Sequence, residues 1–96
     1  MKQNRVQAQA EVQVENDRVK VTEWRFSPGA ETGWHRHVCD YVVVPQTTGK
    51  LLLESKDGTQ QASLQSGLSY YRNAGVEHNV ININENEFVF VEIEMK

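Results

Sequence analysis

The sequence is poor in cysteine, in basic charge and in long apolar runs, and each shortage excludes a class of protein. With a single cysteine, Cys39, the 96-residue chain has no internal disulfide framework. Ten basic and thirteen acidic residues give a net charge of -3, without the basic stripe that nucleic acid binding requires. No apolar run approaches the ~18–20 residues of a membrane-spanning helix, and the first ten residues lack the apolar core of a signal peptide. We therefore expect a cytoplasmic protein that binds neither nucleic acid nor membrane.

The length suits one small domain with a thin hydrophobic core. Hydrophobic residues make up 39% of the chain and charged residues 24%, which are ordinary proportions for a globular protein. No shift in composition and no low-complexity tract marks a linker. We therefore predict a single domain over residues 1–96.

Helical periodicity is also missing, and apolar residues alternate with polar ones at the period of half-buried strands. The runs are separated by turn residues, most clearly the Asp57-Gly58 pair of a β-hairpin. The apolar phase changes after residue 21, which predicts a bulge near Thr22. Short strands at this spacing favour an all-β sandwich or barrel. About eight strands are expected, over residues 6–14, 19–26, 35–44, 51–55, 60–64, 68–72, 76–82 and 88–95.

The three histidines carry most of the functional information. His35 and His37 are two residues apart on a predicted strand, so their side chains share a face that continues through Cys39 and Tyr41. Two neighbouring imidazoles are costly to bury unless a metal ion binds their nitrogens. His78, from a distant strand, can complete a three-histidine site with open positions for water or substrate. We predict one divalent transition metal, with iron, zinc, nickel, manganese and copper all compatible.

Two segments around these histidines resemble the motifs of the cupin family. Residues 29–37 read GAETGWHRH, similar to the first motif, G-x5-H-x-H. Residues 67–82 read GLSYYRNAGVEHNVIN, similar to the second, G-x5-P-x-G-x2-H-x3-N, with Asn73 in place of the proline and Asn82 in a structural position. The resemblance implies a cupin-type double-stranded β-helix, or jelly-roll barrel, with His35, His37 and His78 as metal ligands.

The resemblance extends over residues 19–95 and reaches a subgroup of the family. The segments WRFSPGAETGWHRH, DYVVVP, AGVEHNV and FVFVEIE are similar to short single-domain cupins associated with β-alanine degradation. Small cupins are commonly homodimers. The alternating strand at residues 6–14 precedes the barrel, and we expect it to pair with the sheet of a second copy.

The chain departs from the family at the usual fourth ligand. The first motif normally continues with a glutamate separated from its second histidine by three or four residues, and at those positions this sequence has Tyr41 and Val42. Asp40 has the parity of the opposite face, where pairing with a surface base is expected. Tyr41 has the parity of the missing glutamate, and we predict a catalytic proton donor or acceptor there. Weak ligation, a hydrogen bond to a ligand and an ordinary core tyrosine stay open, as does ligation by the Cys39 thiolate.

Three neutral imidazoles leave a divalent ion near +2, which favours an anionic chelating substrate and acidifies bound water. We expect a metal-dependent, oxygenase-like enzyme acting on a small anionic or dicarbonyl-like metabolite, since three-histidine oxygenases occur in the family. Arg36 and Arg72 can orient such an anion or pair at the surface. A non-catalytic or accessory metal- or metabolite-binding cupin and a metal-dependent isomerase use the same ligands, so both stay open.

Overall fold

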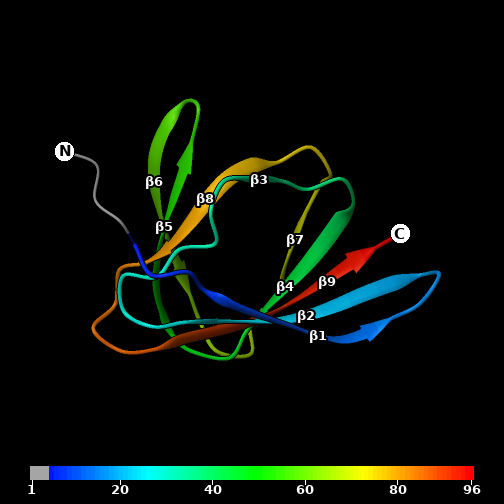
Figure 1. Cartoon of the computed structure of the whole chain (residues 1–96), viewed down its shortest axis with the longest axis horizontal. Coiled ribbons are helices and arrows are strands. Elements are labelled where there is room, and N and C mark those ends of the chain that lie inside the picture. Colours follow the sequence, from blue (N-terminus) through cyan, green and yellow to red (C-terminus); the bar gives the residue numbers. More distant parts are fainter. Residues whose placement is uncertain (1–4) are drawn as a thin grey trace.

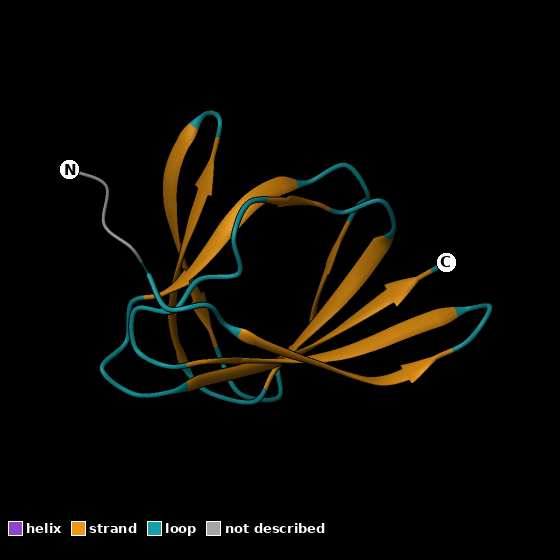
Figure 2. Cartoon of the chain, in the orientation of Figure 1, coloured by secondary structure: helices purple, strands orange, loops and turns teal. Residues whose placement is uncertain are grey.

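The computed structural model describes residues 5–96, and over this range it contains nine strands and no helix. The all-β prediction is confirmed. Strands β1, β2, β9, β4 and β7 form one antiparallel sheet, and β3, β8, β5 and β6 form a second, so that the two sheets face each other (Figures 1 and 2). Nothing in the described range qualifies as a bilayer-crossing helix. The strands are β1 (Gln9–Glu15), β2 (Val19–Phe26), β3 (His35–Arg36), β4 (Asp40–Pro45), β5 (Gly49–Ser55), β6 (Gly58–Leu64), β7 (Tyr70–Arg72), β8 (Glu77–Asn82) and β9 (Phe88–Met95).

The hydrophobic core lies between the sheets and is built from alternate residues of each strand. In β4, Tyr41, Val43 and Pro45 are buried, while the residues between them are partly exposed. Phe26 and Phe88 are fully buried on paired strands. Burial of each such side chain stabilises the fold by about 1.5–3 kcal/mol. The four-stranded sheet completes the core with Leu51, Leu64 and Val80.

The chain crosses from one sheet to the other immediately after β3. β3 belongs to the four-stranded sheet and β4 to the five-stranded sheet. Between them the His37 N–H donates to the Val76 carbonyl at 2.9 Å, and the His37 carbonyl accepts from the Gly75 N–H at 2.7 Å. The backbone here pairs with a loop segment rather than with a strand. The expectation of one continuous strand over 35–44 is therefore wrong, because the chain must leave one sheet to enter the other.

The predicted hairpin and the predicted irregularity near Thr22 are both present. The hairpin at Asp57-Gly58 joins β5 to β6, and Gly58 has φ +119°, a conformation that favours glycine. The register of β1 and β2 shifts between the pairs Val12–Thr22 and Val14–Val21, with the extra residue in β1. β2 itself pairs with β9 without interruption. The apolar phase in β2 changes because Val21 faces outward while Thr22 faces the interior.

The five-stranded sheet carries an apolar row on its outer face. Val42 lies on the face of β4 opposite to the buried Tyr41 and Val43, and its cross-strand neighbours share that face. The β1–β2 hairpin extends the sheet beyond the rest of the molecule (Figure 1), and every residue of β1 is exposed. We call the cross-strand set the outer apolar row, and it consists of Val14, Val21, Ile93, Val42 and Tyr71.

Gly49 is required by close packing, which leads to a stability prediction. A Cβ at Gly49 would lie 2.6 Å from Oδ1 of Asn84, whose side chain is held by hydrogen bonds to the N–H and the carbonyl of Lys50. Gly49→Ala should therefore lower the free energy of unfolding by about 1–3 kcal/mol, measured by urea denaturation. In an Asn84→Ala background the clash is absent and the substitution should have much less effect. Equal losses in the two backgrounds would contradict the steric explanation.

Candidate metal centre

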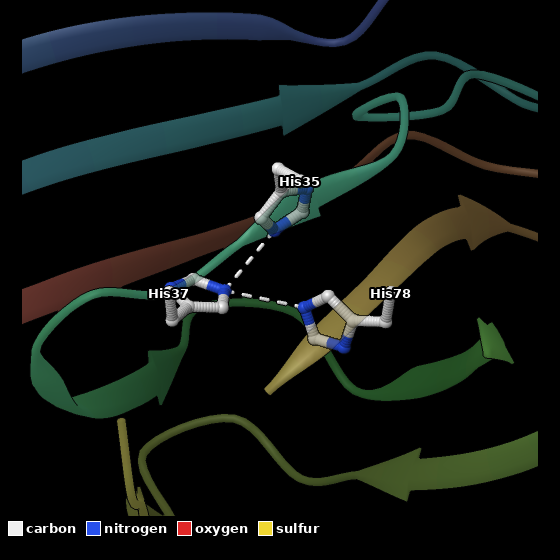
Figure 3. Close-up of side chains that lie close together, drawn as sticks. All are labelled: His35, His37 and His78. Carbon is white, nitrogen blue, oxygen red and sulfur yellow. Dashed lines mark hydrogen bonds between the residues drawn. The ribbon is translucent and has the colours of Figure 1, made fainter. Parts of the chain in front are cut away.

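The three histidines converge at the crossing point between the sheets. His35 on β3 and His78 on β8 are direct cross-strand partners, and His37 lies two residues further along the chain. In Figure 3 the three imidazole rings point toward one another. The Nε2 atoms of His35 and His37 are 3.0 Å apart, and those of His37 and His78 are 3.2 Å apart. The structure thus brings the three predicted ligands together.

These distances fit a bound metal ion. Imidazole nitrogens bind divalent metals at about 2.0–2.1 Å, so two ligands at octahedral or tetrahedral angles are about 2.8–3.4 Å apart. In His35 the Nδ1 atom lies 2.8 Å from the Gly33 carbonyl. Because a carbonyl only accepts hydrogen bonds, Nδ1 carries the proton and Nε2 of a neutral ring keeps its lone pair for a metal. The cluster can therefore hold a cation.

Burial keeps the imidazoles of His37 and His78 neutral. Burial is the main cause that lowers the pKa of His37 to about 4, and the neighbouring His35 and His78 add to it. Burial likewise lowers the pKa of His78 to about 4, with smaller contributions from His35 and Arg72. Neutral rings are the metal-binding form, so protons do not compete with a metal at neutral pH.

A polar network behind His35 holds the loop that carries it. The Thr32 hydroxyl lies 3.3 Å from Nδ1 of His35 and contacts Oδ1 of Asn79. The Asn79 amide in turn donates to Glu31 at 2.7 Å and to Glu54 at 2.9 Å. Asn79 is almost fully buried, so these bonds satisfy groups that would otherwise be costly to bury. Sequence reasoning missed Asn79, because its importance depends on partners from two separate segments, residues 31–33 and Glu54.

Tyr41 contacts the cluster, although it does not share a strand with His37 as predicted. β3 ends at Arg36 and β4 begins at Asp40, so the shared face of one continuous strand does not exist. The Tyr41 ring instead stacks on the His37 ring, with centroids 3.9 Å apart and planes inclined by 21°. Burial, with the nearby Glu92 charge second, raises the pKa of Tyr41 well above its usual value, so the phenol is neutral. The stacked ring limits the orientations open to His37.

Cys39 and Asp40 lie outside the cluster. Cys39 is a free, half-buried thiol that does not belong to either set of potential metal ligands among residues 5–96. Asp40 was expected to pair with a surface base, and this is wrong. Its carboxylate accepts hydrogen bonds from the Tyr71 hydroxyl and the Ala74 N–H, which fixes the turn before β8. These bonds also lower the pKa of Asp40.

Sequence reasoning missed Glu92. This residue of β9 is only 7% exposed, and its Oε2 lies 3.9 Å from Nε2 of His37. Burial, followed by the charge of Glu94, raises the pKa of Glu92 to about 7. A signal was present in the sequence, because Glu92 follows Phe88 and Phe90 at alternate positions on one face of the strand. A carboxylate at such an inward position points into the interior of the barrel.

The cluster opens into a cavity of about 170 Å³. His35, His78, Tyr41 and Glu92 supply polar lining, and Arg72 lies near its Tyr70 wall with the guanidinium 4.6 Å from the ring centroid. No carboxylate among residues 5–96 forms a salt bridge with Arg72. The volume is below the ~300–1,000 Å³ of sites for drug-sized ligands, so the cavity suits a small metabolite. The other predicted anion contact, Arg36, lies instead on a separate surface groove.

Similar proteins identify the family. No family model matches the sequence. The β-alanine degradation protein BauB of Pseudomonas aeruginosa is 62% identical over 92 residues, which cover 96% of this chain and 97% of that protein. A solved cupin domain from Bordetella pertussis Tohama I is also 62% identical, with a TM-score of 0.96 over 99% of each chain. The chain belongs to the cupin family. The predicted resemblance to the subgroup associated with β-alanine degradation is confirmed.

More distant cupins share the fold alone. A double-stranded β-helix protein from Klebsiella pneumoniae is 20% identical and has a TM-score of 0.78, covering 98% of this chain and 81% of that one. The predicted cupin double-stranded β-helix is thus confirmed. At such low identity the likeness carries no information about activity.

The lowered histidine pKa values predict the behaviour of the metal-free protein. In an NMR titration His37 and His78 should protonate near pH 4, whereas the urea-unfolded chain, as a control, should protonate near the ordinary value of 6.5. Because the folded-state pKa values are lower, the histidine contribution to stability is complete above pH 6.5 and declines as the pH falls toward 4. Midpoints near 6.5 in the folded protein would contradict the buried, neutral cluster.

Proposed function

We propose that this cupin binds one divalent transition metal ion through His35, His37 and His78 and acts as an oxygenase-like enzyme on a small anionic metabolite. The observation that carries the proposal is the convergence of three imidazole Nε2 atoms at 3.0 and 3.2 Å beside a cavity. A bound ion supplies Lewis-acid chemistry, which polarises an oxygen ligand and lowers the pKa of bound water.

The residues around the cavity support an anionic substrate. Arg72 borders it without a carboxylate partner in the described chain and stacks on Tyr70, which restrains its planar guanidinium. A guanidinium binds a carboxylate through two parallel hydrogen bonds, so Arg72 can orient the far end of a substrate whose near end faces the histidines. Tyr41, held neutral by burial, serves in this proposal as the proton donor.

The name of BauB supports a substrate class. That protein is described as acting in β-alanine degradation. β-Alanine and the products of its deamination are three-carbon carboxylates, which suit both the small cavity and Arg72. We therefore propose a three-carbon carboxylate or dicarbonyl compound as the substrate. A metal- or metabolite-binding protein without turnover and a metal-dependent isomerase are the alternative outcomes of the tests below.

Elemental analysis of the purified protein tests the metal proposal. The native protein should hold close to one transition metal per chain, and His37→Ala should lose it because the central ligand is removed. Cys39→Ser is the matched control and should keep the metal, since its thiol lies outside the histidine cluster. Absence of metal from the native protein, even after reconstitution, would refute the proposal.

The identity of the metal then selects the assay. Iron directs the next experiment to oxygen consumption with three-carbon carboxylates, where turnover that depends on His37 would support the oxygenase. Zinc or nickel, with turnover that persists without oxygen, would favour the isomerase. Stoichiometric metal without any turnover would favour the non-catalytic binding protein.

We also propose a homodimer that buries the outer apolar row. Val14 and Tyr71 at the ends of this row are 46% and 50% exposed, and β1 leaves its backbone edge open for a second sheet. Light scattering at micromolar concentration should give a dimer, and Val42→Lys, which puts a charge in the middle of the row, should give a monomer. Ile83→Lys is the control and should stay dimeric, because this apolar residue is 42% exposed and lies outside the row, in the loop after β8. A monomeric native protein would contradict the proposal.

A further inference from the structure

Glu92 is a buried carboxylate that faces the histidine cluster and has no cation partner. Its side chain is 9% exposed, and the one basic group within salt-bridge distance among residues 5–96 is the His37 imidazole, at 3.9 Å. Lys20, the cross-strand partner of Glu94, forms no salt bridge with Glu92 and has the smallest of the effects on its pKa. A buried carboxylate without a counterion is costly to ionise, and a cation bound beside Glu92 would offset that cost.

The geometry relates Glu92 to the same ion as the histidines. Two atoms that bind one ion at about 2.0–2.2 Å are at most about 4.4 Å apart, and the 3.9 Å from Oε2 to Nε2 of His37 is within that limit. Oxygen and nitrogen ligands of His37, Glu92 and Glu94 also lie within 4.8 Å of one another. The three imidazoles form a tighter set without Glu92, so coordination requires the carboxylate to turn toward them about its side-chain torsions.

Resting on the proposed metal binding, we propose that Glu92 supplies a fourth, carboxylate ligand to the three-histidine centre. The first cupin motif usually provides this carboxylate from the strand that here contains Tyr41. In this chain Tyr41 is committed to stacking on His37, and Glu92 comes from β9, the strand that pairs with β4. The missing glutamate of the motif is thus replaced from a neighbouring strand.

Glu94 is the alternative carboxylate and is less suitable. It is more exposed than Glu92, and it lies between Lys20 and Tyr41 in the cross-strand order of the sheet. Lys20 offers it a positive charge outside the histidine cluster. Glu94 therefore makes a matched control, because it has the same chemistry at a similar distance from His37 but a different environment.

A carboxylate as the fourth ligand, beside three imidazoles, changes the charge of the centre and the substrates that it suits. The net charge of the centre falls from about +2 to about +1, and a carboxylate suits harder ions better than imidazole alone does. Four protein ligands leave two positions in an octahedral ion. Two open positions suit a substrate that chelates through two oxygens, which agrees with a small carboxylate or dicarbonyl compound.

Titration calorimetry with Zn²⁺ and Co²⁺ on the metal-free protein tests this proposal. Glu92→Gln, which keeps the shape and removes the charge, should weaken metal binding by roughly tenfold or more and change the visible absorption of the Co²⁺ form. Glu94→Gln should leave both close to native values. Glu92→Asp should fall between native protein and Glu92→Gln, because its carboxylate is drawn back by one methylene.

The outcomes separate the two proposals. If the native protein binds neither ion, the metal-binding function itself fails. If the native protein binds and Glu92→Gln binds equally well with the same Co²⁺ spectrum, only the role of Glu92 is refuted. Equal weakening by Glu92→Gln and Glu94→Gln would also refute it, because the effect would then be general attraction by negative charge. Circular dichroism of the metal-free variants verifies that each is folded.

Discussion

The crossing of the backbone from one sheet to the other at His37 is the constraint on which the site depends. His35 and His78 are placed by strand pairing, but His37 can reach them because its own backbone bonds to Val76 and Gly75 instead of continuing β3. The chain leaves the four-stranded sheet at His37, and this places the third imidazole beside His35 and His78. The same crossing delivers Tyr41 to the opposite sheet, where it stacks on His37. The segment that links the two sheets is therefore also the segment that completes the histidine cluster.

This arrangement puts opposing demands on stability and function. His37 and His78 are packed where their protonation is disfavoured, and the Glu92 carboxylate is buried beside His37 without a salt-bridged lysine or arginine in the described chain. Neither arrangement stabilises the metal-free fold. A bound metal ion would relieve both, since it would bind the imidazole lone pairs and offset the charge of the carboxylate. The close-packed core around Phe26 and Phe88 supports the strands that carry these groups.

The sequence was sufficient for the fold and for the three histidines, because both depend on local patterns. Alternation, turn residues and motif spacing are read within short windows, and they predict the strands and the three histidines that converge in the structure. The continuous strand at 35–44 was wrong, because a sheet crossing depends on partners elsewhere in the chain. Asn79 and Glu92 were missed for the same reason. Each becomes important only through groups brought to it by other strands.

The proposed role of Glu92 illustrates why a motif departure is weak evidence for a changed site. In a barrel, neighbouring strands place several side chains at the same depth, and β9 lies beside β4 over the length in which the motif glutamate would be found. A ligand can therefore move from one strand to the next without moving much in space. Tyr41 occupies the position of the motif glutamate, and its ring packs against His37. The chemistry of such a centre is determined by which groups face the cavity rather than by which segment of the sequence supplies them.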